Sequence, residues 1–192
     1  KNKGDLFLWN DTCCIDKSTL TEAANSIASM GEWYTNAEFC IVHLSTNYEW
    51  LDDLLPGSAN GYNSKQPYWA KRGWTLQELC LSRRAYYFNN KWRQLTVNPQ
   101  ASGDECQIIA TVSSVPQSEV CRGRRSSAVS AFELLGFASH RQCTIPVDRI
   151  YSTMGMLGVK FVTFNAEGPC MALNRLLDHV VSLTRDVSIF NW

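Results

Sequence analysis

Two side chains that could do chemistry together lie one helical turn apart in the stretch RGWTLQEL, residues 72–79. Trp74 and Glu78 are spaced i, i+4, so a helix places them on one face. A carboxylate can stabilise a developing positive charge, and an indole can stack on a planar ring. Such a pair also occurs by chance, and the ordinary alternative is a core tryptophan beside a solvated or arginine-paired glutamate. Trp74 and Glu78 are therefore site candidates that need support from other motifs.

The elements around this helix predict a parallel α/β unit. At about 100° per residue, the arc roughly opposite Trp74 and Glu78 is apolar and can pack on a sheet. The helix lies between two strand-like runs, residues 39–44 and 84–89. Strand, helix, strand is the pattern of a parallel α/β unit. The apolar arc consists of Trp69, Gly73, Leu76, Leu79 and Cys80.

Asp11 and Asp16 follow an apolar run at residues 5–10, which predicts a buried strand. Ligands bind at loops that follow the carboxyl ends of parallel strands, so both aspartates are candidate binding residues. Local backbone capping, which aspartate does well in turns, is an equally open interpretation.

The segment that follows Asp16 predicts a crossover helix at residues 19–36, opened by the capping-box pattern of Thr19 and Glu22. The next strand, residues 39–44, should then lie parallel to the first, through a right-handed connection. Residues 45–67 predict a long loop with one helical turn, and it could cover a site as a lid.

Beyond residue 92 the pattern becomes mainly helical. A polar linker is expected at residues 116–127 and a short last strand at 187–190. Gly158 is a suitable helix stop, and Pro169 suits a first helical turn. The expected helices cover residues 104–115, 127–138 and 146–157, with a last one that starts at 169. We therefore expect one domain over residues 1–192, with an α/β part at 1–92 and a mainly helical part at 93–192.

Composition excludes some classes of partner and site. The formal net charge is zero, which argues against a general nucleic-acid or anionic-membrane surface. The eight cysteines have no CxxC spacing, so we expect buried reduced thiols in a cytoplasmic protein. The three histidines lack metal-ligand spacing, and no metal site is expected. No apolar run is long enough to cross a membrane, and no signal peptide is visible.

Two arginines could take part in a site. Arg72 and Arg141 could pair with Asp11, Asp16 or Asp148, or they could contact phosphate groups. Buried ion pairing is the plainer alternative. Tyr151 is expected in the core.

Three separated stretches resemble motifs of fungal heterokaryon-incompatibility (HET) domains. Residues 9–17 (WNDTCCIDK) resemble the family's W-x-D-T-C-C-I-D-K segment, and residues 72–79 its R-G-W-T-L-Q-E-L segment. Residues 141–157 are similar to its R-x-T-T-x-x-E-D-x-x-Y-s-l-l-G segment. The end, residues 186–192, is similar to the D-x-S-I-F-a-W close common in mushroom members. The family's usual opening Y-x-x-L-S-Y/H-x-W-G strand is absent, so we expect a fragment that lacks its first strand.

The resemblance implies a role in fungal non-self recognition, in which HET domains trigger programmed cell death. HET domains also look like distant relatives of TIR domains, which implies an α/β fold: a TIR/flavodoxin-like parallel sheet in the N-terminal half and a mostly helical C-terminal half. Enzymatic TIR domains carry a Trp-x-x-x-Glu pattern whose glutamate serves NAD cleavage, and Trp74 and Glu78 match that spacing.

The resemblance thus implies a TIR-like NAD glycohydrolase that needs no cofactor and takes NAD as substrate. Glu78 would be the catalytic carboxylate, and it should open into a cleft beside residues 11–16. The alternative is a non-catalytic death-signalling module that acts by self-association or on a sensor protein. An unrelated flavodoxin-like domain would need a glycine-rich phosphate loop, which the sequence lacks. The substrate-binding candidates are Trp74, Asp11, Asp16, Arg72 and Arg141.

Overall fold

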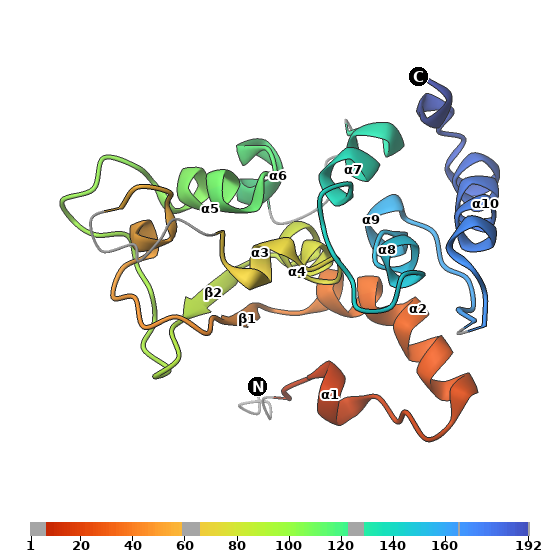
Figure 1. The fold of residues 1–192 in the computed structure, drawn as a ribbon, viewed down its shortest axis with the longest axis horizontal. Coiled ribbons are helices and arrows are strands. Elements are labelled where there is room, and N and C mark those ends of the chain that lie inside the picture. The colour runs from red at the N-terminus through yellow and green to blue at the C-terminus, as the bar shows by residue number, and fades with distance from the viewer. Residues whose placement is uncertain (1–6, 59–65, 123–128, 165, 192) are drawn as a thin grey trace, which may run out of the picture.

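The computed structural model describes residues 7–58, 66–122, 129–164 and 166–191. The two strands lie at one end of the molecule, and helices α7 to α10 lie at the other (Figure 1). In chain order the elements are α1 (Asp11–Cys14), α2 (Leu20–Asn36), β1 (Cys40–His43), the 3₁₀ turn η1 (Leu51–Leu54), α3 (Tyr68–Lys71), α4 (Thr75–Leu81), β2 (Ala85–Phe88), α5 (Glu105–Ser113), α6 (Gln117–Arg122), α7 (Ala131–Ala138), α8 (Asp148–Tyr151), α9 (Met154–Leu157), α10 (Pro169–His179), the π-helical η3 (Val180–Thr184) and the 3₁₀ turn η4 (Ser188–Phe190).

The expected parallel α/β unit is confirmed in the middle of the chain. Strands β1 and β2 pair in parallel, with Cys40 opposite Ala85 and His43 opposite Phe88. Helix α4 lies in the connection between them, and its apolar arc is buried, including Leu76 and Leu79. The described chain is therefore mixed α/β. A two-stranded sheet does not by itself establish the strand order of a TIR or flavodoxin-like fold.

The strand expected at residues 5–10 is wrong for residues 7–10. Residues 5 and 6 lie outside the part of the chain that the structure describes. Residues 7–10 form no strand, and the side chain of Asn10 accepts hydrogen bonds from the backbone N–H groups of Thr12 and Cys13. That cap starts α1 directly after the apolar run. Trp9 packs on Trp33 of α2, with ring centroids 4.9 Å apart. Of the described residues in this run, Trp9 contacts α2 while Phe7 and Leu8 are exposed, and the expected parallel crossover from residues 7–10 does not form.

The helical second half matches the expected pattern with three corrections. The described part of the expected linker contains helix α6. Pro116 precedes its first residue, and the Pro116 carbonyl accepts hydrogen bonds from the N–H groups of Glu119 and Val120. The single helix expected at 146–157 is two short helices, α8 and α9, and Gly158 ends the second at φ 68°. The expected last strand is the 3₁₀ turn η4. This turn caps α7, because the Ser188 hydroxyl accepts a hydrogen bond from the N–H of Phe132.

The cysteines agree only in part with the expected set of buried reduced thiols. Cys40 and Cys80 are free and buried, and burial raises the pKa of each to about 12. Cys13 and Cys170 are free but exposed. Cys106 is disulfide-bonded, which the expectation of eight thiols did not include. The spacing of cysteines in a sequence does not show which of them the fold brings together.

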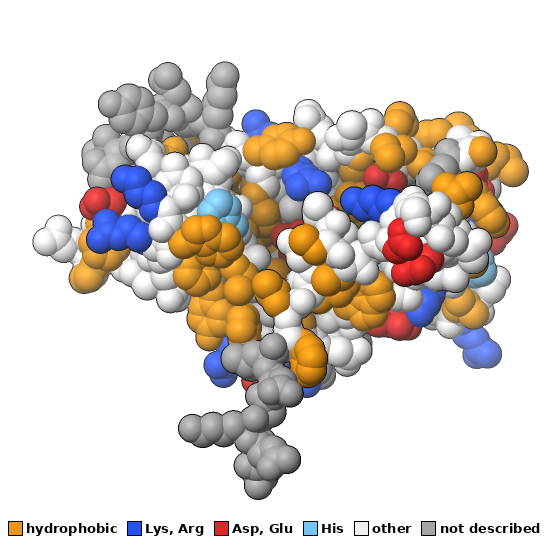
Figure 2. Space-filling view, turned by 90° about the horizontal axis from the view of Figure 1, so that it is seen from below, with side chains coloured by type: hydrophobic (Ala, Val, Ile, Leu, Met, Phe, Trp, Pro, Cys, Tyr) orange, Lys and Arg blue, Asp and Glu red, His pale blue; other side chains and the backbone are white. Residues whose placement is uncertain are grey.

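One face of the small sheet is apolar and exposed. The side chains of Phe39, Ile41 and Trp92 are 41%, 39% and 63% exposed, and Trp92 stacks on His43 with ring centroids 4.4 Å apart. Figure 2 shows hydrophobic side chains gathered on this side of the molecule over the β1–β2 region. We call Phe39, Ile41 and Trp92 the sheet face. Of the helices described, none is long and apolar enough to span a bilayer.

Helices α2 and α9 cross where Gly31 and Gly155 are in close contact, so a larger side chain at this point should destabilise the fold. A Cβ on Gly155 would lie 2.7 Å from Cα of Gly31 and would also clash with the Gln77 side-chain oxygen. Gln77 is 1% exposed and cannot swing out. Gly155→Ala should therefore lower the free energy of unfolding by about 1–3 kcal/mol, measured by urea denaturation.

Gly136→Ala is the matched control for that substitution. Gly136 lies in α7, and a Cβ there meets nothing within 4 Å. The control should be neutral or stabilising by about 0.5–1 kcal/mol, because alanine suits a helix better than glycine. Equal effects of the two substitutions would contradict the close crossing of α2 and α9.

Candidate functional site

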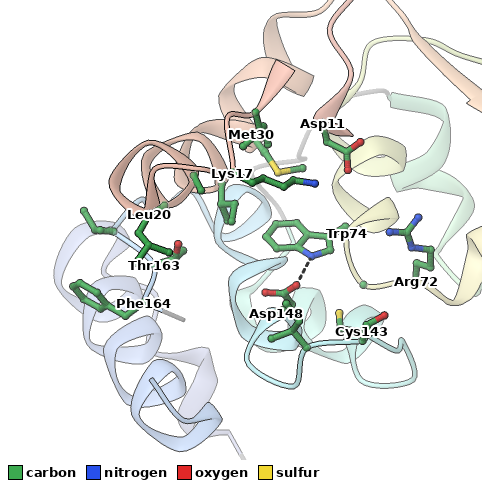
Figure 3. A pocket seen from close by; sticks show the side chains of 18 of the residues that line it. Asp11, Lys17, Leu20, Met30, Arg72, Trp74, Cys143, Asp148, Thr163 and Phe164 are labelled. Carbon is green, nitrogen blue, oxygen red and sulfur yellow. Dashed lines mark hydrogen bonds between the residues drawn. The ribbon is translucent and has the colours of Figure 1, made fainter. Parts of the chain in front are cut away.

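A cavity of about 920 Å³ opens between α1, α2, the start of α4 and α8 (Figure 3). One wall is the apolar side of α2, including Ile27 and Met30, and another is formed by Val162, Thr163, Phe164 and Ala166. The size is within the range of small-molecule sites, roughly 300–1,000 Å³. Four charged residues line it: Asp11, Lys17, Arg72 and Asp148. Of the loop 45–67 that is expected as a lid, no described residue belongs to the lining, and residues 59–65 lie outside the described part.

Trp74 lines this cavity and forms a hydrogen bond with the carboxylate of Asp148. It is the residue just before α4, and its indole Nε1 donates a hydrogen bond to Oδ2 of Asp148 at 3.1 Å (Figure 3). Asp148 is the first residue of α8 and is partly buried. Burial raises the pKa of Asp148, and the hydrogen bond from Trp74 partly offsets the rise. The indole and the carboxylate that meet at the cavity are thus Trp74 and Asp148.

Glu78 lies next to this cavity but does not line it. Its two carboxylate oxygens accept hydrogen bonds from Trp69 Nε1 at 3.0 Å and from Tyr34 Oη at 3.5 Å. Burial raises the pKa of Glu78, hydrogen bonds and the Arg72 charge lower it, and the Asp11 charge raises it. Asp11 and Arg72 both line the cavity, so Glu78 is close enough to its rim to interact with two rim charges.

The other expected site residues divide between the cavity and the rest of the fold. Asp11 and Arg72 line the cavity. Asp16 is exposed, and its side chain accepts the N–H of Ser18 at 2.8 Å, which matches local capping. That hydrogen bond lowers the pKa of Asp16. Arg72 lies over the Tyr68 ring, 6.0 Å from its centroid.

Arg141 is a buried structural residue in this fold, 5% exposed. Its guanidinium donates to the backbone oxygens of Arg72 and Ser113 at 3.0 and 3.2 Å, and to Thr75 Oγ1 at 3.2 Å. No ion pair joins Arg72 or Arg141 to Asp11, Asp16 or Asp148 within the described ranges. Neutral oxygens bond the two terminal nitrogens of the arginine instead, and its buried Nε has no hydrogen-bond partner among the described residues.

Lys17 and Asp148 are pocket residues that motif reasoning did not place in the site. Lys17 closes the stretch WNDTCCIDK, and Asp148 entered only as a partner for an arginine. Both line the cavity, and the Lys17 ammonium points into it between Asp11 and Trp74 (Figure 3). Their signal was present in the two family-like stretches that contain them. In the described part of the chain, no group of three or more His, Cys, Asp or Glu residues could hold a metal ion.

The wall that contains Val162 and Phe164 is bonded to Tyr151, which is a core residue as expected. The Tyr151 hydroxyl donates to Glu167 at 2.5 Å and accepts the N–H of Phe164 at 3.1 Å. Arg175 donates to the carbonyl of Val162 at 2.6 Å. These contacts fix the backbone at Val162 and Phe164, which have no regular secondary structure and still form one side of the cavity.

Glu78 gives the stability of the fold a defined pH dependence. Its folded-state pKa is raised above the ordinary 4.5, so its contribution to stability is fully present below pH 4.5 and is lost as pH rises through the raised value. Glu78→Gln cannot ionise and should not lose this stability. The melting temperature of the variant relative to wild type should therefore rise with pH above 4.5.

The control for this prediction is Glu133→Gln. Hydrogen bonds from Ser130 lower the pKa of Glu133, so the stability it adds is present above pH 4.5 and lost as pH falls. Relative to wild type, the melting temperature of that variant should fall as pH rises toward 4.5 and should then stay constant above pH 4.5, where the difference between Glu78→Gln and wild type grows. Parallel melting curves for Glu78→Gln and wild type above pH 4.5 would contradict the buried position of Glu78.

Comparison with known proteins agrees with the motifs. The family model described as Heterokaryon incompatibility protein (HET) matches residues 1–67. Vegetative incompatibility protein HET-E-1 of Podospora anserina is 31% identical over 180 residues, which cover 92% of this chain and 13% of that protein. This chain therefore spans about 13% of the length of that relative. No solved structure matches significantly. On this evidence, the chain belongs to the heterokaryon-incompatibility (HET) family.

Proposed function

We propose that this chain acts in the cytoplasm in fungal heterokaryon incompatibility and triggers programmed cell death. The proposal is supported by the family and by the similarity to a protein named for vegetative incompatibility. Because the chain spans a small part of that relative, the proposal concerns the HET segment alone. The trigger would reach it through a sensor or partner protein.

The chemistry that fits the cavity is NAD hydrolysis. The bond between ribose C1′ and the nicotinamide nitrogen breaks, and its electron pair leaves with nicotinamide. The ribosyl carbon becomes oxocarbenium-like, a water oxygen bonds to it, and the water proton passes to solvent. A carboxylate close to the ribose stabilises the developing cation, as in glycoside hydrolysis. Glu78 is the proposed catalytic carboxylate, carried over from the Trp-x-x-x-Glu pattern.

The single observation that supports this chemistry is the cavity itself. It combines an apolar wall for a planar base, the cations Lys17 and Arg72 for phosphates, and acids at its rim. Lys17 and Arg72 are exposed, and neither forms a salt bridge with another described residue. Both are thus available to an anionic ligand such as the pyrophosphate of NAD.

The test is nicotinamide release from NAD by the full-length protein and by its Glu78→Gln variant. The expected result is a loss of about 100-fold or more in the variant, since charge stabilisation at the reacting centre has effects of that size. The amide keeps an acceptor for Trp69 and a group that can bond Tyr34, so the fold should persist. Equal turnover by both proteins would remove Glu78 from the mechanism.

The second candidate function is a non-catalytic death-signalling module, and the sheet face favours it. Phe39, Ile41 and Trp92 present apolar surface to solvent, and such surface often marks a contact with another protein. Toxicity in a fungal host separates the two functions. Cell death that survives Glu78→Gln but fails in Ile41→Asp would support the module. Cell death that fails in Glu78→Gln and survives Ile41→Asp would support the enzyme.

A further inference from the structure

Glu78 and Asp148 are the two carboxylates that could contact a ligand in the cavity, and their surroundings differ. Glu78 has a hydrogen-bond donor on each oxygen and does not line the cavity. Asp148 lines the cavity. One of its oxygens, Oδ2, accepts the Trp74 indole N–H. Among the described residues, no donor bonds Oδ1. Asp148 therefore has an acceptor to offer to a bound molecule, whereas Glu78 has both of its oxygens engaged.

Trp74 fixes where that acceptor points. The indole is partly buried, and its N–H reaches Asp148 from a segment 74 residues away in the chain. Because a tryptophan ring has two side-chain torsions and a single donor, the hydrogen bond allows the carboxylate little rotational freedom. The Cys143 thiol also lines the cavity; burial raises its pKa, and the nearby charge of Asp148 raises it further.

The rest of the cavity indicates which donor would meet Asp148. Carboxylate oxygens accept hydrogen bonds from hydroxyl groups, and paired hydroxyls of a sugar suit a partly desolvated carboxylate. Lys17 and Arg72 line the same cavity and suit phosphate, and the α2 wall suits a planar base. A molecule that carries a base, a sugar and phosphates is a nucleotide.

We propose that Asp148 contacts the bound nucleotide directly, by accepting hydrogen bonds from its ribose hydroxyls, and that Trp74 is the positioning residue for this carboxylate. This inference rests on the proposed function for the identity of the ligand and adds a second carboxylate to the site. In this arrangement the indole of Trp74 orients Asp148 and not Glu78.

The test uses ADP-ribose, which keeps the ribose and phosphates of NAD but lacks the nicotinamide–ribose bond that the proposed reaction breaks. Its affinity for the full chain is measured by calorimetry for wild type, Asp148→Asn, Trp74→Phe and the double variant. Asp148→Asn should weaken binding about 10-fold or more, because the amide nitrogen that replaces one oxygen cannot accept a hydrogen bond. Asp178→Asn is the control, since Asp178 is exposed on α10 and lies outside the cavity lining.

The double variant tests the positioning role of Trp74. If Trp74 acts through Asp148, Trp74→Phe should weaken binding in the wild-type background and add little to Asp148→Asn. A tryptophan that merely packs, or that stacks on the ligand, would add its full effect in both backgrounds. Should Asp148→Asn melt earlier than wild type, Asp148→Ser must show the same loss of affinity at a temperature where both are folded.

The outcomes keep the two proposals apart. Unchanged ADP-ribose affinity in Asp148→Asn, or no ADP-ribose binding by wild type, would overturn the role of Asp148. Weakened binding in Asp148→Asn, with no nicotinamide release by wild type, would support Asp148 and overturn NAD hydrolysis. Nicotinamide release that depends on Glu78, together with full affinity in Asp148→Asn, would support hydrolysis and overturn the role of Asp148.

Discussion

Replacing Arg141 by methionine is expected to lower the free energy of unfolding by about 3 kcal/mol or more. The guanidinium is buried, and it supplies donors to the carbonyls of Arg72 and Ser113 and to the Thr75 hydroxyl. Methionine fills similar space but has no donor, so these oxygens lose their partner away from water. Burial lowers the pKa of Arg141 to about 10, which still leaves it charged at neutral pH.

Urea denaturation of the full chain measures this loss, with Arg149→Met as the control. Arg149 is exposed and makes one hydrogen bond, to the Ser139 carbonyl at 3.2 Å. Its replacement should change stability by no more than about 0.5 kcal/mol. If Arg141→Met were as mild as the control while ligand affinity fell, Arg141 would be a binding residue and not a structural one.

Removing the two cations of the cavity is expected to weaken NAD binding about 100-fold or more. Lys17→Met and Arg72→Met together delete two charged donors that line the cavity and form no salt bridge with another described residue. Each contact between a charged donor and a phosphate oxygen contributes about 1.5–3 kcal/mol. Calorimetry on the Glu78→Gln background measures affinity without consumption of NAD.

The control for the double variant removes two positive charges from the surface outside the cavity. Arg84 and Lys91 are exposed and do not line the cavity, so Arg84→Met with Lys91→Met changes the net charge equally. This control should bind NAD with little change. A similar loss in both double variants would mean that the overall field of the protein, and not the cavity, attracts the nucleotide.

Periodicity predicted the elements that carry their own signal. Helix α2 follows the apolar spacing from Leu20 onward, and α10 starts at Pro169 as expected. Strands β1 and β2 were recognisable because each is a short apolar run on either side of α4. The two strands that were wrongly expected, at residues 7–10 and 187–190, failed for one reason: contacts with distant parts of the chain determine the structure of short apolar segments. Trp9 packs on Trp33 of α2, and η4 caps α7, and neither partner can be read from local spacing.

The cavity was only partly predictable for a related reason. Its lining comes from several separated segments, and only Trp74, Asp11 and Arg72 among the lining residues were expected in the site. The i, i+4 spacing places two residues on one helix face but does not fix the partners of their side chains. Trp74 has helical backbone dihedrals, yet its indole bonds Asp148 of α8 while Glu78 bonds Trp69. Sequence spacing cannot show that difference of direction.

The most direct measurement of whether NAD occupies this cavity is the alkylation rate of Cys143. Its thiol is free, partly buried and part of the lining, and Cys170 is a free exposed thiol outside it. Iodoacetamide labelling of the Glu78→Gln protein, followed by peptide mass spectrometry, reports both thiols in one sample. Burial raises the pKa of Cys143, so labelling is best done at mildly alkaline pH. We expect saturating NAD to slow labelling of Cys143 several-fold and to leave Cys170 unchanged. Equal labelling of Cys143 with and without NAD would contradict a nucleotide site beside Trp74.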